Sequence, residues 1–289
     1  MSNTIELAKS FVPKLDECYR LASLTSVLDG APELAKQGAN ANELIIPMMS
    51  MDGLADYSRN GGYVQGGVTM TNETVKCNFD RGRRFDVDVM DDLETAGLAF
   101  GRLSAQFIRD KVVPELDAFR FASYCGISGV TKNEETLADG AATVAALSAA
   151  VTAMDDEEVT ATGRYLFITP TLLQGINDMD TTKSKKVLEG FEQVIKVPQR
   201  RFYTAIKQLS GKTGEEAGGY TKATGAANIN FAIVQKDALI QYTKHAAPKI
   251  IAPENNPDAD AYVFGYRMVG IAKAYKNMLS GMYFSHDKA

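Results

Sequence analysis

One short stretch of this sequence, FDRGRRFDVDVMDD at residues 79–92, concentrates charged side chains that could do chemistry. Clustered aspartates can hold a divalent cation. The stretch lacks the glycine and the closing glutamate of a calcium loop, and Asp86 and Asp88 alternate along an expected strand. Asp91 and Asp92 fall at an expected helix start, where free N–H groups and the helix dipole favour acids. The pattern favours architecture, and a metal-dependent hydrolase stays the alternative.

Other familiar catalytic patterns fail at their spacing. The motif GKT at residues 211–213 suggests a phosphate loop, but the position of the first glycine is Ile206. His245 is expected at a helix end and His286 in the terminal tail, and these are the only 2 histidines. No G-x-S-x-G, HExxH or CxxC motif occurs. The sequence therefore predicts no catalytic residue, no metal site and no cofactor, and the chain is not expected to be an enzyme.

Composition bounds the class of protein. The chain has 289 residues, of which 45% are hydrophobic and 23% charged, as in an ordinary globular protein. The formal net charge of -5 gives no electrostatic reason to expect a nucleic-acid binder. The start lacks the apolar run of a signal peptide, and residues 141–154 are too short to span a bilayer. The cysteines at 18, 77 and 125 are far apart, which favours reduced thiols in a cytoplasm. No membrane association is expected.

The elements that must position the charged stretch can be read from periodicity. Residues 1–44 are expected to be a mobile arm with helical fragments, and residues 44–49 an edge strand cut by Pro47. Residues 75–79 and 85–89 alternate apolar and polar side chains, which predicts a β-hairpin with its tip at residues 80–84. Leu93, Ala96, Phe100, Leu103 and Phe107 recur at helical spacing, which predicts a helix over residues 92–113. Pro114 should kink this helix or open a second one.

The remainder of the chain predicts a mixed α+β arrangement. We expect a loop at 131–135, an alanine-rich helix at 141–154, a buried strand at 165–168 and a helix that begins at Pro170. A strand at 202–206 and a mobile glycine-rich loop at 210–225 should follow. The apolar segment INFAIVQ at 229–235 then leads into a helix-like segment at 236–245. Residues 248–253 should be extended. Residues 262–275 are apolar on both faces and predict a strand that its own domain or a neighbouring subunit covers, with a last strand near 278–284.

This order of elements, together with three longer segments, resembles the major capsid protein of tailed bacteriophages, the Hong Kong 97 fold. Residues 63–95, YVQGGVTMTNETVKCNFDRGRRFDVDVMDDLET, resemble the extended loop that runs into the spine helix. Residues 107–125, FIRDKVVPELDAFRFASYC, resemble the passage of that helix into the peripheral domain. The C-terminal return is similar over NFAIVQKDALIQYTKHAAPKIIAP and DADAYVFGYRMVGIAKAYKN.

The resemblance implies a division of the chain into an N-terminal arm (1–44), an extended β-hairpin loop (45–90), a peripheral domain with the spine helix (91–140 and 235–275) and an axial domain (141–234 and 276–289). The arm and the loop would reach onto adjacent subunits. Residues on the loop would then pair with charges of a neighbour, each exposed pair contributing on the order of 1 kcal/mol or less. These expected inter-subunit contacts are Arg81, Arg83, Arg84, Asp86 and Asp88.

The resemblance also implies a function. The protein would be a structural protein that assembles with itself, as pentamers and hexamers, into the icosahedral head shell of a tailed phage or prophage. The shell would assemble in the bacterial cytoplasm with a separate scaffolding protein and a portal, and it would enclose double-stranded DNA without sequence-specific binding. The final location would be the virion. The alternative within the same fold is an encapsulin, a shell that holds enzyme cargo.

Overall fold

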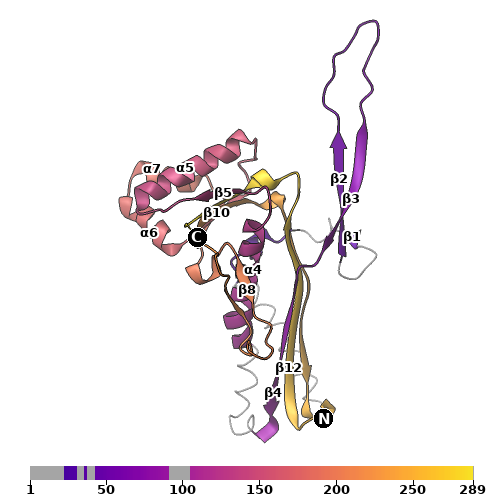
Figure 1. The fold of residues 1–289 in the computed structure, drawn as a ribbon, viewed down its shortest axis with the longest axis vertical. Helices are drawn as coiled ribbons and strands as arrows, with labels where there is room; N and C mark the ends of the chain where they lie inside the picture. Colours follow the sequence, from indigo (N-terminus) through magenta and orange to yellow (C-terminus); the bar gives the residue numbers. More distant parts are fainter. Residues whose placement is uncertain (1–22, 31–35, 38–42, 91–104, 289) are drawn as a thin grey trace.

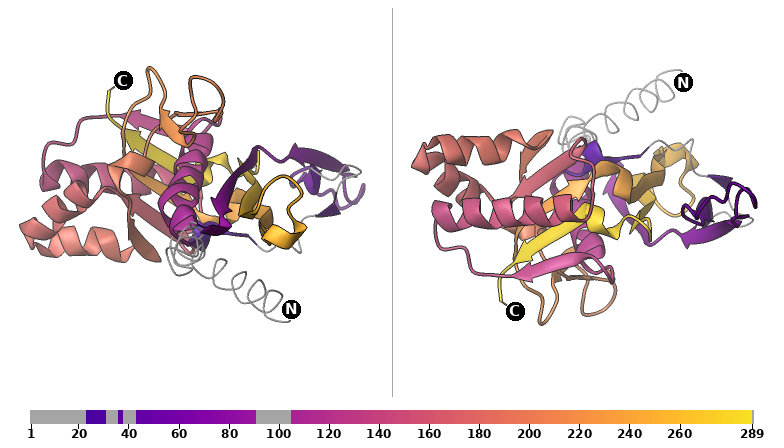
Figure 2. Two further views of the ribbon diagram at one scale, coloured as in Figure 1. Left: turned by 90° about the horizontal axis from the view of Figure 1, so that it is seen from below. Right: turned by 90° about the horizontal axis from the view of Figure 1, so that it is seen from above.

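The computed structural model of the protein describes residues 23–30, 36–37, 43–90 and 105–288. The subunit is elongated: a hairpin projects from one end, a long antiparallel sheet runs to the other end, and a compact α/β body lies to one side (Figure 1). The hairpin and the helices of the body lie at opposite edges of the molecule when it is seen along its length (Figure 2). This mixed architecture agrees with the predicted α+β class.

The body is built on a five-stranded sheet in the order β5-β13-β10-β6-β7. Strands β6 and β10 hold its centre and are buried along their whole length, which explains their continuous apolar runs. The buried strand expected at 165–168 is thus confirmed, and the apolar segment at 229–235, for which no element was predicted, forms β10. The strands are β5 (Thr131–Glu134), β6 (Arg164–Ile168), β7 (Gln193–Lys196), β10 (Ile229–Gln235) and β13 (Met282–His286).

The loop expected at residues 131–135 was wrong, because Thr131–Glu134 forms the edge strand β5. This strand pairs in parallel with β13, from Thr131 opposite Tyr283 to Glu134 opposite His286. Its side chains are exposed on both faces. An edge strand without a buried face shows no alternation of apolar and polar residues, so its periodicity could not identify it.

Three helices pack on this sheet: α5 (Gly140–Asp156), α6 (Pro170–Met179) and α7 (Thr182–Glu189). The side chain of Asp139 caps α5 by accepting a hydrogen bond of 2.8 Å from the backbone N–H of Ala142. Pro170 opens α6 as predicted. The apolar faces of α5 and α6 join the inner face of the sheet in one core cluster that includes Leu147, Ile176 and Phe231.

The second sheet is a long antiparallel ribbon in the order β11-β12-β4, with β11 at Leu239–Ile251, β12 at Ala261–Ala274 and β4 at Phe79–Asp88. It overturns two predictions. The hairpin with its tip at residues 80–84 was wrong, because Phe79–Asp88 is one unbroken strand paired with β12. The helix-like segment at 236–245 was also wrong, because beyond the short 3-10 turn Lys236–Ala238 the chain continues as β11.

Gly82 lies within strand β4, where it permits a close approach of β12 and does not form a turn. A Cβ at this position would lie 2.8 Å from the carbonyl oxygen of Tyr266 on β12. Strands β4 and β12 therefore approach closely only because residue 82 has no side chain. Similarly, His245 lies at a register shift of β11 rather than at a helix end. The strand predicted at residues 262–275 is confirmed as β12.

Helix α4 (Val113–Cys125) connects the two sheets. A π-helical turn at Ile108–Val112 leads into it without a break, just before Pro114. Pro114 lies in the first turn of α4, as predicted for a proline that opens a second helix, because the N–H groups of a first helical turn have no partner within the helix. Ala118, Phe121 and Tyr124 are buried as expected. The rest of the predicted helix, with its start at Asp91 and Asp92, lies outside the described residues.

The projecting element is a hairpin of β2 (Glu43–Met51) and β3 (Val68–Lys76), with the short strand β1 (Lys36–Gln37) beside the base of β2. Pro47 lies opposite Asn72 of β3 and beyond the stretch of β2 that pairs with β1. The missing N–H of the proline therefore costs no hydrogen bond between β1 and β2. Residues 202–206 form no strand until Ile206, where β8 (Ile206–Gln208) begins. The glycine-rich loop returns as β9 (Tyr220–Lys222).

Candidate subunit-interface surfaces

The β2–β3 hairpin exposes an unusual number of large apolar side chains. Leu54 is fully exposed, and Tyr63 is 90% exposed. Further exposed apolar side chains on the same hairpin are Met49, Met51, Tyr57, Val64, Val68 and Met70. Single exposed apolar residues are ordinary, but so many on one projecting element are typical of a surface that another molecule covers. The hairpin is the strongest candidate for a contact between subunits.

The loop that closes this hairpin is ordered by its own hydrogen bonds. The backbone N–H of Gly67 donates to the Asp52 carboxylate over 2.7 Å, and the N–H of Asp52 donates to the carbonyl oxygen of Gly67 over 3.1 Å. Nearer the tip, Ser58 and Gly62 form a β-bridge, and Gly62 has a φ of 74°. These bonds hold the apolar side chains on a defined scaffold, so a partner would not have to order the whole loop.

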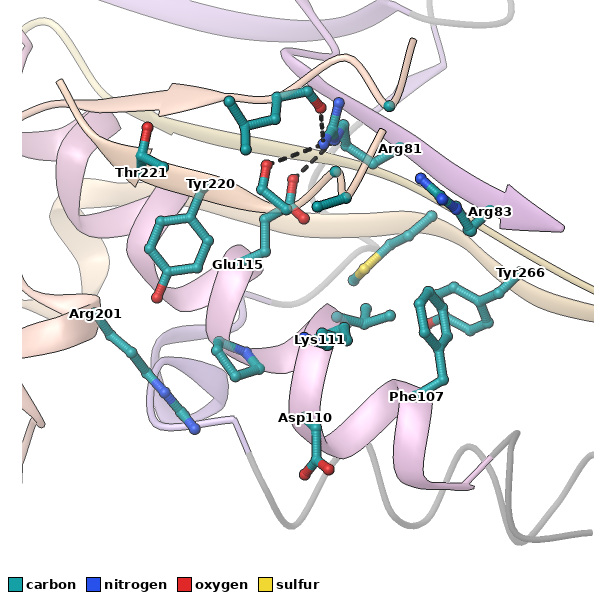
Figure 3. A pocket seen from close by; sticks show the side chains of 18 of the residues that line it. Arg81, Arg83, Phe107, Asp110, Lys111, Glu115, Arg201, Tyr220, Thr221 and Tyr266 are labelled. Carbon is teal, nitrogen blue, oxygen red and sulfur yellow. Dashed lines mark hydrogen bonds and ion pairs between the residues drawn. The ribbon is translucent and has the colours of Figure 1, made fainter. Parts of the chain in front are cut away.

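Arg81 and Arg83 of β4, both predicted to contact a neighbouring subunit, have partners within the chain. Figure 3 shows the contacts of Arg81. The Nε of Arg81 donates to the Glu115 carboxylate of α4 over 2.8 Å. Its Nη2 donates to the carbonyl oxygens of Leu209 and Gly219, over 2.7 and 3.3 Å. Arg81 therefore ties the β8–β9 loop to both α4 and β4.

Arg83 enters the same loop farther along. Its Nη2 donates to the carbonyl oxygen of Glu216 over 2.9 Å. Its Nη1 lies where a side chain on Gly211 or Gly218 would come within 3.0 or 3.1 Å, and both glycines have positive φ angles. The glycine-rich composition of the loop is thus matched to the arginine that it surrounds. The loop was predicted to be mobile, whereas its described contacts fasten it to the strand.

Arg84, Asp86 and Asp88 of β4 face solvent. Arg84 and Asp86 form an exposed ion pair of 2.8 Å, two residues apart on β4. The pKa of Arg84 is raised by the hydrogen bond to Asp86. The Asp88 carboxylate accepts a hydrogen bond from the backbone N–H of Met90 over 2.8 Å. Among the residues that the structure describes, no group of three or more histidine, cysteine, aspartate or glutamate side chains could hold a metal ion.

Sequence reasoning missed a buried polar cluster around Asp117 of α4. Its fully buried carboxylate accepts hydrogen bonds from the hydroxyl of Ser23 (2.9 Å) and from the N–H (3.1 Å) of Leu24. It also accepts from the N–H and the hydroxyl of Thr25, over 3.3 and 2.7 Å, and from Arg201 over 3.2 Å. Thus residues 23–25, placed by prediction in a mobile arm, are docked on the body.

Two further side chains extend this cluster to the second sheet. Arg120 of α4 is buried and donates to the Thr25 hydroxyl over 2.9 Å. Gln241 of β11 donates to the carbonyl oxygen of Thr25 over 2.6 Å and accepts from Tyr124 over 2.6 Å. A short polar segment, separated from its partners by more than ninety positions, carries no periodic signal that could have revealed this docking.

The two described thiols are not poised for chemistry. Burial raises the pKa of Cys125 to about 11, and burial also raises the pKa of Cys77. Thiolates are the reactive species, so neither thiol is activated near neutral pH. Among the described helices, none has both the length and the apolar character that a membrane-spanning segment requires.

Comparisons of the chain with known proteins agree with this architecture. No protein-family model and no curated protein matches the sequence. Solved structures do match. "Gordonia phage Cozz" is 10% identical, with a TM-score of 0.61 over 93% of this chain and 87% of the other. "Capsid structure of the Cyanophage P-SCSP1u" is 12% identical, with a TM-score of 0.54 over 88% and 86%.

A third match is titled "Crystal structure of virus-like particle from Pyrococcus furiosus". It is 10% identical, with a TM-score of 0.60, and the alignment covers 96% of this chain and 98% of the other. Likeness at such low identity concerns the fold, which here extends over nearly the whole chain in each case. The chain therefore has the fold of phage capsid proteins that its sequence resembles, the Hong Kong 97 fold.

Proposed function

We propose that this protein is the major capsid protein of a tailed phage or prophage, and that copies of it assemble into an icosahedral shell around double-stranded DNA. The observation that carries the proposal is the projecting β2–β3 hairpin, whose apolar side chains no other described part of the subunit covers. Burial of one such side chain in a partner contributes about 1.5–3 kcal/mol. The fold is shared with solved shells, which supports the same assignment.

We further propose the domain roles that the sequence resemblance implies. Residues 1–44 act as the arm, residues 45–90 include the loop that reaches a neighbour, residues 91–140 and 235–275 form the peripheral domain, and residues 141–234 and 276–289 form the axial domain. The exposed positions of Arg84, Asp86 and Asp88 on β4 support their proposed contact with a neighbouring subunit. Arg81 and Arg83 would contribute to such a contact while they hold the β8–β9 loop.

Electron microscopy of the purified full-length chain tests the proposal, with closed shells as the expected result. A double variant, Leu54→Asn and Val64→Asn, should stay folded by circular dichroism and sediment as free subunits, because it removes apolar surface without touching the body. A matched control in the same exposed loop, Asn60→Ser and Gln65→Ser, should still form shells. Shells from the first variant that match those of the wild type would remove the hairpin from assembly.

A second candidate function is an encapsulin-type compartment. The observation that favours this second function is the match to the virus-like particle from Pyrococcus furiosus, which spans nearly the full length of both chains. Nucleic-acid sequencing and mass spectrometry of particle contents separate the two functions. Packaged phage DNA in native particles supports the virion, whereas a defined enzyme inside particles that lack DNA supports the compartment.

A further inference from the structure

A wide cleft of about 1340 Å³ lies between β4, the π-helical turn before α4 and the β8–β9 loop. Its walls carry an excess of basic side chains on a protein whose net charge is -5. They also include the aromatic rings of Phe107 and Tyr266. Arginine and tyrosine are enriched at the centres of protein interfaces, and clefts lined by one sign of charge concentrate partners of the opposite sign.

The two acids of this cleft are too few to neutralise all of its basic side chains. Glu115 is already bound by Arg81. The carboxylate of Asp110 points away from Arg81 and Arg83 (Figure 3). Among the cleft's cations, Arg109, Lys111 and Arg200 are exposed, and none of the three side chains has an ion-pair or hydrogen-bond partner among the described residues. Three cationic side chains without a counter-charge in one cleft would attract an anionic partner.

The chain itself carries an acidic turn at the end of α5. Asp156, Glu157 and Glu158 are exposed, and their carboxylates have no partner among the described residues. The turn is held rigid: Asp155 pairs with the buried Arg164 over 2.7 Å, and the N–H of Val159 donates to the carbonyl oxygen of Met154. Acids at the C-terminal end of a helix also oppose its dipole, each at a cost of roughly 0.3–1 kcal/mol.

We propose that the acidic turn at residues 156–158 of one copy docks in the basic cleft of a neighbouring copy. This inference rests on the proposed function, because it names a contact through which copies of the chain would join. Helix α5 packs on the five-stranded sheet of the body, whereas the cleft lies along β4 and the β8–β9 loop (Figure 1). The contact would therefore link the body of one copy to the sheet ribbon of the next.

Charge reversal followed by charge exchange tests this docking. The cleft variant carries Arg109→Glu, Lys111→Glu and Arg200→Glu. The turn variant carries Asp156→Lys, Glu157→Lys and Glu158→Lys. Each alone should raise the protein concentration at which shells form by roughly ten-fold, since about three ion pairs become repulsive. A copy that carries both sets should regain most of the lost assembly, because the signs are opposite again.

Controls keep the result specific. The charge-conserving variant, with Arg109→Lys, Lys111→Arg and Arg200→Lys, should assemble like the wild type. Carbodiimide cross-linking of assembled wild-type particles should join Lys111 or Lys222 of one copy to the acidic turn of another. A mixture of isotopically light and heavy subunits identifies such links as intermolecular by mass spectrometry.

Normal assembly of either reversal variant would overturn the docking, and so would failure of the combined variant to recover. Loss of bound nucleic acid by the cleft variant, with an unchanged assembly concentration, would also overturn it, since the cleft would then serve a polyanion. These outcomes leave the shell function standing. Absence of particles from the wild-type chain would instead refute the proposed function itself.

Discussion

Replacing Asp117 with alanine should separate the segment at residues 23–30 from the body. This buried carboxylate is the acceptor for donors on Ser23, Leu24 and Thr25 and for Arg201. Its loss leaves the buried donors of Thr25 without an acceptor, and Arg201, whose side chain is 22% exposed, without its ion pair. Breaking a buried charged cluster costs about 3–5 kcal/mol, and because Arg201 has partial access to water we expect a loss of about 3 kcal/mol.

This loss should lower the Tm of free subunits on the order of 10 °C. Thermal unfolding should be followed at concentrations where subunits do not assemble, because assembly stabilises the folded state by mass action. Hydrogen exchange provides a local readout: the N–H groups of Leu24 and Thr25, which donate to Asp117, should exchange faster. Asp86→Ala, on an exposed side chain, is the control and should change stability by less than about 0.5 kcal/mol.

The reasoning fails if Asp117→Ala unfolds within about 1 kcal/mol of the wild type, since the cluster would then contribute no more than a single ordinary hydrogen bond. It also fails if the exchange of the Leu24 and Thr25 N–H groups is unchanged. In that case other contacts, such as the packing of the buried Leu28 against the core cluster of α4, would hold the segment in place.

Three further predictions follow from single contacts. Arg81→Ala should cost about 1–3 kcal/mol in denaturant unfolding and increase hydrogen exchange in the β8–β9 loop, whereas Arg84→Ala, at an exposed ion pair, should leave the denaturant midpoint unchanged. Gly140→Ala should destabilise the subunit by about 1–3 kcal/mol or more in denaturant unfolding, because the new Cβ would collide with the carbonyl oxygen of Gly175. Gly175→Ala should cost less in the same assay, because its Cβ would meet nothing nearer than 3.4 Å. Hydrogen bonds from Lys207 and Ser210 lower the pKa of Glu215 from 4.5 to about 2, so its contribution to loop stability is present above pH 4.5 and is lost as pH falls through about 2. A carboxylate titration by NMR with its midpoint near pH 4.5 would contradict this contact.

Buried runs and helix signals were the parts of the fold that sequence could predict. Strand β6 is buried on every residue, and its short apolar run predicted a buried strand. Pro170 at the start of α6 is a local rule that needs no tertiary contact. The capsid fold itself was recognised from the order of longer segments, and the structural matches extend over most of the chain.

Pairing between distant strands was what sequence could not supply. The residues around Gly82 have the composition of a turn between two alternating runs, yet the glycine serves the close approach of β12, nearly two hundred positions away. The sequence likewise could not indicate which groups Arg81 and Arg83 bind within the subunit, or that residues 23–25 dock on Asp117. Polar contacts of this kind have no period, so only coordinates reveal them.

The distribution of these contacts implies a division of labour within the subunit. Arg81 and Arg83 fasten the β8–β9 loop to β4, and the Asp117 cluster fastens residues 23–25 to α4. Charged groups of β4 and α4 thus stabilise contacts within the subunit. The hairpin, in contrast, exposes apolar side chains on a scaffold of backbone hydrogen bonds. Apolar burial is non-directional and supplies most of the energy of association, while charge complementarity fixes orientation. We therefore expect the buried charged groups to order the free subunit and, in the proposed shell, the exposed apolar side chains of the hairpin to bind a neighbouring copy.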